Sequence, residues 1–276
     1  MYRTRRKITG SLLTLLTVIL VLGSITPLLW LISTSLKNKL EAFAIPPKMI
    51  FTPTFENYES VFQTGGFLPS YVNSLIIAVL TTALTLVFGV TSGYALARMK
   101  SRAGSVMGMW IILARMIPPI GIIIPFYMMF RQVGINDQYI SVCLVYMTIT
   151  LPFATWLMMG FIRDVPDEIE EAAMIDGCTR TQSLIRIVIP VVKPGLGTCA
   201  IFSFIQSWNE FLYALIITGK NTRTVSVAIQ GFVSSSGTSW GSLCAASMLV
   251  ILPILIFSIF TQRSLVRGLT SGAVKM

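Results

Sequence analysis

The chain has 276 residues, of which 54% are hydrophobic and only 12% are charged, and its mean hydropathy is +0.77. A soluble domain normally carries about 25% charged residues, so the composition indicates a protein that crosses a membrane several times. The net charge of +10 does not favour nucleic-acid binding, because the basic residues sort by loop and form no patch interleaved with aromatic residues. The chain contains no histidine, and its four cysteines form no close pair, which argues against a metal site.

Six apolar stretches are each long enough to cross about 30 Å of hydrocarbon. They lie near residues 11–33, 71–97, 106–130, 139–162, 190–217 and 243–262. We expect all six to be helices, because a spanning backbone must satisfy its own hydrogen bonds and the stretches lack the alternating polarity of barrel strands. The predicted fold class is therefore all-α, with one polytopic transmembrane domain over residues 1–276.

The third stretch contains helix-breaking residues near its middle. Pro118, Pro119 and Pro125 fall within it, together with Gly121. Proline removes a backbone donor and clashes with the preceding turn, so this span is predicted to be kinked or locally unwound.

The lysines and arginines predict the orientation of the spans. Fourteen of them lie at the N-terminus, in the 98–105 loop, in the 163–193 segment and in the tail, whereas six lie in the loops on the other side. Cytoplasmic loops carry the excess of lysine and arginine. Both termini are therefore predicted to be cytoplasmic, which agrees with an even number of spans.

Few polar side chains occur at membrane depth. Arg115 lies in the third stretch and Glu210 in the fifth, and a charge there is costly unless it is paired or hydrated. Gln206, Asn209 and Glu210 have the spacing of one helix face, which should turn inward. These residues either line a pathway or form hydrogen bonds that stabilise helix packing. The candidates for the two roles are Asn73, Arg115, Gln206, Trp208, Asn209 and Glu210.

The segment 164–189, between the fourth and fifth stretches, holds six of the chain's eleven carboxylates. Pro166 suits a first helical position, and the acidic residues after it lie where the helix dipole is positive. Gly177 is a natural left-handed helix stop. Thr179 and Gln182 form a capping box for a second helix, which Pro190 is expected to interrupt. The segment is thus predicted to be a helix–Gly–helix elbow on the cytoplasmic side.

The elbow carries a motif spread over about twenty positions. It reads Glu-Ala-Ala at 171–173, Asp-Gly at 176–177 and Ile-Val-Ile-Pro at 187–190. This spacing resembles the "EAA" signature of permease subunits of ATP-binding-cassette (ABC) importers, although Ile189 stands where that family usually has leucine. The resemblance implies that the elbow couples to an ATPase through Glu171, Ala172, Ala173, Asp176, Gly177, Ile187 and Pro190. The alternative is a solvated loop whose charges only keep it out of the bilayer.

Two further segments resemble the carbohydrate branch of this family. The tail, residues 263–276, contains Arg-Gly-Leu-Thr-Ser-Gly-Ala-Val-Lys at 267–275, which resembles the ending of maltose-transporter-like permeases. The resemblance implies a cytoplasmic tail that reaches towards the ATPase, and the alternative is a basic anchor after the last span. Trp-Asn-Glu-Phe at 208–211 resembles a sequence that sugar-importer permeases carry in the same place.

The resemblance implies a six-span permease subunit of the bacterial inner membrane that imports di- or oligosaccharides by alternating access. Its expected partners are a second homologous permease subunit, two cytoplasmic ATPase subunits, an extracytoplasmic substrate-binding protein and membrane lipid. ATP and magnesium would bind the ATPase, and this chain would need no cofactor of its own. Gly219-Lys220 is the nearest approach to a phosphate-binding loop, but the flanking residues do not fit the motif.

Other classes of protein fit the residues less well. Within the same family, the solute could be different, for example glycerol phosphate. An ion-coupled secondary transporter should carry acidic or histidine residues at the bilayer midplane, where only Glu210 qualifies. An intramembrane enzyme would need a nucleophile and a base, and the chain has no histidine to serve as the base.

Overall fold

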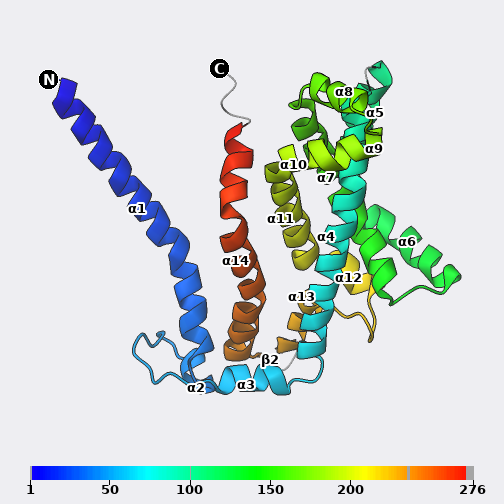
Figure 1. The fold of residues 1–276 in the computed structure, drawn as a ribbon. Helices are drawn as coiled ribbons and strands as arrows, with labels where there is room; N and C mark the ends of the chain where they lie inside the picture. The colour runs from blue at the N-terminus through cyan, green and yellow to red at the C-terminus, as the bar shows by residue number, and fades with distance from the viewer. Residues whose placement is uncertain (1, 100, 235–236, 272–276) are drawn as a thin grey trace. The chain divides into compact units, whose positions relative to one another are not determined.

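The computed structural model describes residues 2–99, 101–234 and 237–271, with side chains described within residues 13–259. The described residues are mostly helical, which confirms the predicted all-α class (Figure 1). They divide into two compact units. One comprises Met1–Phe67 with Ile229–Leu252, and the other comprises Leu68–Ala228 with Pro253–Met276.

The first unit is built around two long helices. Its elements are α1 (Tyr2–Ser35), α2 (Lys39–Ala42), α3 (Glu56–Gln63), a 3₁₀ turn η2 (Ile229–Phe232), the strands β1 (Val233–Ser234) and β2 (Gly237–Thr238), and the beginning of α14 (Trp240–Ser271). The two strands form a short antiparallel pair. Asn57 of α3 donates hydrogen bonds to the carbonyl oxygens of Ser35 and Lys37 at 2.9 and 2.6 Å, and so fastens α3 to the end of α1.

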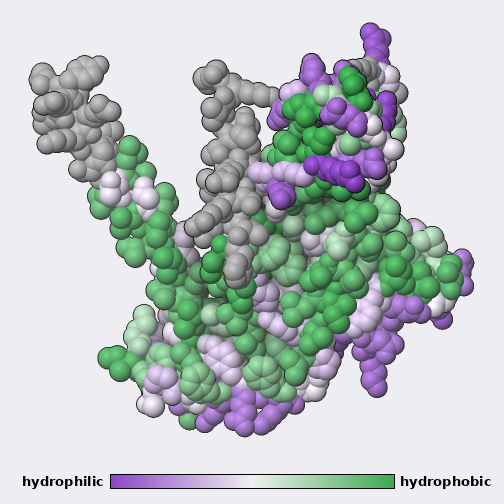
Figure 2. Space-filling view, viewed as in Figure 1, coloured by the Kyte–Doolittle hydropathy of each residue, from purple (hydrophilic) through white to green (hydrophobic). Residues whose placement is uncertain are grey.

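The second unit contains the remaining helices. They are α4 (Phe67–Arg98), α5 (Arg102–Ala114), α6 (Pro119–Val133), α7 (Tyr139–Arg163), α8 (Asp167–Ile175), α9 (Arg180–Ser183), the π-helical turn η1 (Leu184–Val188), α10 (Ile189–Val191), α11 (Lys193–Asn209), α12 (Leu212–Ile217) and α13 (Val225–Ala228). Figure 2 shows apolar side chains over the long helices of this unit and hydrophilic ones gathered around the end that carries α8 and α9. That distribution is typical of a bundle whose sides face lipid.

Within the described residues, four helices are long and apolar enough to cross a membrane. They are Leu13–Ser35 of α1, all of α4, all of α7 and Trp240–Ile259 of α14. Two bent pairs also qualify, which makes six if each pair is one span: Gly104–Ala114 with Pro119–Val133, and Arg180–Val191 with Lys193–Asn209.

The third predicted span is broken, as its prolines predicted. The bend between α5 and α6 is 90°. Pro118 has φ −59° and ψ 128° because the following Pro119 excludes the helical conformation at the residue before it. Pro119 then begins α6, where its missing N–H costs nothing.

The fifth predicted span, 190–217, is not one helix either. Helix α11 ends at Asn209, and Glu210 is extended with φ −66° and ψ 128°. The Glu210 carboxylate accepts hydrogen bonds from the backbone N–H groups of Tyr213 and Ala214, both at 3.1 Å, and so caps α12. This local bonding competes with continuation of α11. The prediction that Gln206, Asn209 and Glu210 share one helix face is therefore wrong for Glu210.

Helices α4 and α7 lie in close contact through small residues. A Cβ atom at Gly93 would lie only 3.0 Å from the Cβ of Met158, and one at Gly89 would lie 2.8 Å from the Cβ of Ala154. The Thr85 and Thr150 hydroxyls are hydrogen-bonded at 2.7 Å between the same two helices. Small residues and hydroxyl pairs of this kind hold transmembrane helices together, because apolar burial alone drives little association in lipid.

Candidate functional site

The acidic helix α8 of the elbow has the predicted termini, shifted by one residue at its start. Pro166 is the N-cap and not the first helical residue, so α8 begins at Asp167. Gly177 has a left-handed φ of +89°. Its N–H donates to the Met174 carbonyl at 3.1 Å, and the Cys178 N–H donates to the Ala173 carbonyl at 3.0 Å. These two bonds form a Schellman motif, which explains why a glycine ends the helix here.

The second half of the elbow begins at the predicted capping box. The Thr179 N–H donates to the Gln182 side chain at 2.8 Å, and the Gln182 N–H donates to the Thr179 hydroxyl at 3.3 Å. The sequence predicted that Pro190 interrupts this helix, but the helix continues past it. The Ile189 N–H donates to the Leu184 carbonyl and closes a π-helical turn, and the helix continues through Pro190 to Val191. An 82° bend then leads into α11.

The elbow is packed against the long helices by an apolar cluster. Leu184 and Val188 of η1 are buried with Val90 of α4 and with Met158 and Ile162 of α7. The second half of the elbow therefore continues the core between α4, α7 and α11, so that a displacement of η1 displaces that core as well.

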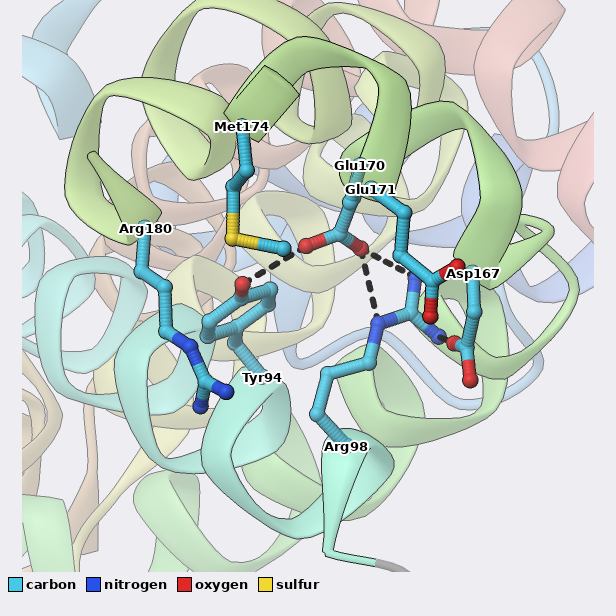
Figure 3. A pocket seen from close by; sticks show the side chains of 7 residues that line it. All are labelled: Tyr94, Arg98, Asp167, Glu170, Glu171, Met174 and Arg180. Atoms are coloured by element: carbon cyan, nitrogen blue, oxygen red, sulfur yellow. Dashed lines mark hydrogen bonds and ion pairs between the residues drawn. The ribbon is translucent and has the colours of Figure 1, made fainter. Parts of the chain in front are cut away.

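An ion-pair network joins the first half of the elbow to the end of α4 (Figure 3). The Arg98 guanidinium donates through Nε to Glu170 Oε1 at 2.7 Å, and a second nitrogen contacts the same oxygen. It also lies 2.9 Å from Asp167 and donates to the Val165 carbonyl at 3.1 Å. The Tyr94 hydroxyl donates to the other Glu170 oxygen at 2.6 Å. We call Tyr94, Arg98, Asp167 and Glu170 the α4–α8 clamp.

The clamp was not predicted from the sequence. Arg98 was considered only as a marker of cytoplasmic orientation, and Glu170 was not distinguished from its acidic neighbours. One signal was available: Tyr94 and Arg98 are four residues apart at the end of an apolar helix, and therefore share a face that needs a polar partner. The location of that partner depends on tertiary structure.

Beside the clamp is a small pocket of about 100 Å³. It is lined by Tyr94, Arg98, Asp167, Glu170, Glu171, Met174 and Arg180 (Figure 3). Within the described part of the chain, Arg180 has no carboxylate within 4 Å, unlike Arg98. The guanidinium of Arg180 is therefore unpaired at the edge of this pocket, which the exposed Glu171 also lines.

The motif residues are divided between the surface and the interior of the elbow. Glu171, Ala172 and Asp176 are exposed, and Ile175 is 87% exposed although it is apolar. Ala173 is buried, with 6% exposure, so its small side chain fits against the protein itself. Of the other two residues in the motif, Ile187 is half-buried and Pro190 is exposed. Direct contact with a partner is thus open to Ala172 and closed to Ala173.

Three of the candidate pathway residues have packing partners in the structure. Trp208 is 2% exposed and meets the Tyr71 ring edge-on at 5.4 Å. Asn73 accepts from the Tyr139 hydroxyl at 2.6 Å and donates to the carbonyls of Asn221 and Arg223. Glu210 caps α12, as described above. These contacts are of the kind expected for residues that stabilise helix packing, which is one of the two roles that the sequence left open.

The other three candidates have different environments. Arg115 is exposed at the end of α5, with its guanidinium 5.1 Å from the centre of the Phe153 ring. Gln206 is half-buried and Asn209 is exposed. The side chains of Arg115 and Asn209 are therefore exposed in this subunit, and their assignment to a pathway stays a prediction. The tail at 263–276 lies outside the residues whose side chains are described.

Asp137 organises a loop that the sequence analysis did not single out. It has a left-handed φ of 57°, which aspartate tolerates better than most residues. Its carboxylate accepts hydrogen bonds from the N–H groups of Gly219, Asn221 and Thr222 and from the Thr222 hydroxyl, at 2.7–3.0 Å. Burial alone would raise the pKa of Asp137, but these hydrogen bonds outweigh burial and hold its pKa below the usual value.

We expect the 219–222 loop to loosen in acid. Because the pKa of Asp137 is lowered by folding, its stabilising effect is complete above the unfolded value of about 3.9 and is lost as the pH falls through the lower folded value. Hydrogen exchange of the 219–222 amides should therefore show protection at pH 7 that declines only below about pH 4. Asp137→Asn should lower protection at pH 7 by about tenfold and remove the acid dependence. The same acid profile in Asp137→Asn and in the unmodified protein would contradict this assignment.

Comparison with known proteins places these features in a family. Residues 85–270 match the family described as "Binding-protein-dependent transport system inner membrane component". The diacetylchitobiose uptake system permease protein of Streptomyces coelicolor is 36% identical over 94% of this chain and 94% of its own. The trehalose transport system permease protein of Mycobacterium tuberculosis is also 36% identical, over 93% of this chain and 94% of its own. A crystal structure of a bacterial ABC transporter that imports alginate contains a chain with a TM-score of 0.78 at 23% identity, covering 93% of this chain and 96% of that one.

Proposed function

Because the chain belongs to the family of binding-protein-dependent transport system inner membrane components, we propose that it is one of two permease subunits of an ABC importer for di- or oligosaccharides. As a permease component it is a multi-pass inner-membrane protein and not an enzyme. The proposal of a sugar substrate is supported by the relatives named for uptake of diacetylchitobiose and of trehalose. The same family could serve another solute such as glycerol phosphate, which no named relative above favours.

The elbow is proposed to dock on a cytoplasmic ATPase that binds ATP and magnesium. The observation that carries this proposal is the exposure of Ile175 and Ala172, next to the acidic Glu171, at the end of a helix with a rigid stop. A helix that offers an apolar tip and a charged edge fits a groove on a partner protein. Both chain termini would then lie on the same cytoplasmic side as the elbow, in agreement with the distribution of lysine and arginine.

The docking proposal is tested by changing the exposed apolar tip. Ile175→Glu should reduce retention of the ATPase in a pull-down by at least about tenfold, because a charge would enter the centre of a desolvated contact. Ile50→Glu is the matched control, since Ile50 is 94% exposed in a loop predicted to lie on the opposite side of the membrane. Equal retention of the ATPase by both variants would refute docking through α8.

The substrate class is tested by uptake in cells that carry the complete transporter. Labelled trehalose, maltose and diacetylchitobiose should include at least one sugar whose uptake requires ATP hydrolysis. Uptake of glycerol phosphate with none of the three sugars would favour the other solute class.

A further inference from the structure

The α4–α8 clamp connects two helices that are far apart in the sequence. Arg98 is the last residue of α4, and Glu170 lies in the first turn of α8, 72 positions further along the chain. Tyr94 and Arg98 share one face of α4 because they are four residues apart, and Asp167 and Glu170 share one face of α8 because they are three apart. The two faces meet, so that every charged group of the clamp has a partner in it.

The clamp is unusual among the charges of the elbow because its central carboxylate, that of Glu170, is buried, while Arg98 and Asp167 are partly exposed. Glu170 is 5% exposed, whereas Glu168 and Glu171 beside it are exposed to solvent. Burial of an ion pair costs desolvation energy that its attraction often fails to recover, so net stability is a weak explanation for it. Arg98 on one oxygen of the Glu170 carboxylate and Tyr94 on the other do, however, fix the relative orientation of the groups that carry them.

Helix α8 is also attached within the elbow. Helix α8 packs on α9 and on η1, which both belong to the elbow itself. Its first turn follows the short link from α7, and its last turn ends at the left-handed Gly177. The side chains of α8 are joined to α4 by the hydrogen bonds and ion pairs of the clamp.

We propose that Arg98 and Glu170 are positioning residues that make α8 and α4 move as one body. The proposal rests on the proposed docking of the elbow on an ATPase, and it specifies the route by which the movement enters the membrane. A shift of α8 would pull the end of α4 through the clamp. Helix α4 would carry α7 with it through the contacts at Gly89 and Gly93. Rigid, discretely packed elements of this kind carry coupling between distant sites.

The first test is the ratio of ATP hydrolysed to sugar imported by the reconstituted transporter, measured with the three labelled disaccharides. Glu170→Gln should raise this ratio by about tenfold, a typical size for coupling between sites, because hydrolysis continues while uptake falls. A loss of folded protein would lower both rates together and leave the ratio unchanged. Glu168→Gln is the matched control, since Glu168 is an exposed carboxylate on the same helix.

A double-mutant cycle then tests whether the two residues act as a pair. Arg98→Gln with Glu170→Gln should raise the ratio no further than either change alone, because one broken clamp cannot be broken again. Tyr94→Phe removes a single hydrogen bond and keeps the ring, so it should give a smaller change in the same direction. An unchanged ratio in Glu170→Gln, or effects that multiply in the double variant, would overturn the proposal.

Two substrate-independent measurements distinguish this proposal from the proposed docking. Hydrogen exchange across residues 167–175 should increase in Glu170→Gln and not in Glu168→Gln, and equal exchange in the two variants would overturn the clamp. Glu170→Gln should also keep the ATPase bound in the pull-down. Loss of the ATPase in this variant would make Glu170 a docking residue and overturn its positioning role. Failure of Ile175→Glu to release the ATPase, in contrast, would refute docking.

Discussion

Replacement of Gly93 by leucine should prevent the subunit from reaching a stable folded state. A Cβ atom at Gly93 would lie 3.0 Å from the Met159 backbone nitrogen and 3.1 Å from the Thr155 carbonyl oxygen. Backbone atoms cannot rotate away as the end of a flexible side chain can, so α4 and α7 would have to separate. Overpacking of this kind costs about 1–3 kcal/mol and occasionally more, and the separation would also break the Ser92–Thr155 hydrogen bond.

The measurement is the yield of monodisperse protein after membrane extraction, followed by size-exclusion chromatography. Gly160→Leu is the matched control. Gly160 lies in α7, the helix that packs against Gly93, but a Cβ atom at Gly160 would have no neighbour within 4 Å. The control should give nearly the yield of the unmodified protein, and Gly93→Leu should give little or none. Equal yields would show that α4 and α7 do not depend on close approach at this point.

The helix boundaries were predictable where one residue's backbone preference decides the outcome. Pro118 and Pro119 break the third span, and Gly177 ends α8, because a fixed φ or a positive φ dominates over any packing. The capping box at Thr179 and Gln182 was predictable for the same reason, since both of its hydrogen bonds are local.

The break at Glu210 was not predictable from helical spacing. A glutamate is compatible with a helix interior. Glu210 lies outside α11 because its carboxylate accepts hydrogen bonds from the N–H groups at the start of α12. The partners of Asn73 and Asp137 were hidden for a different reason. The partners of Asp137 lie more than 80 residues away in the sequence, and those of Asn73 lie 66 to 150 residues away, so they follow from tertiary folding and not from any local pattern.

The division of the elbow into an inner and an outer face also depends on tertiary contacts and not on local preferences. Glu170 and Glu171 are identical side chains at adjacent positions, and no local preference predicts which of them is buried. Arg98 pairs with Glu170 because the face of α8 that carries Glu170 packs against the end of α4. The EAA spacing indicated the elbow that is proposed to dock, whereas the clamp depends on the three-dimensional arrangement.

Gly177→Val should leave the subunit in the membrane but uncouple ATP hydrolysis from sugar uptake. Valine at the left-handed φ of +89° costs about 1–2 kcal/mol, since its Cβ approaches the following carbonyl oxygen. The Schellman bonds of Cys178 and Gly177 would weaken, and the second half of the elbow would leave α8 in a different direction. A misdirected elbow would still insert with its spans, but it would no longer transmit the movement of the ATPase to α4 and α7.

The control for this variant separates backbone conformation from side-chain size. A Cβ atom at Gly177 would meet nothing within 4 Å, so any larger residue fits the space and only the φ angle matters. Gly177→Asn adds a side chain of similar bulk to valine, but asparagine enters the left-handed region far more readily. Uptake and hydrolysis should therefore stay coupled in Gly177→Asn and separate in Gly177→Val, at equal amounts of subunit in the membrane. If both variants lose coupling equally, the elbow would be sensitive to bulk at its tip, and its left-handed stop would not be what directs the second helix.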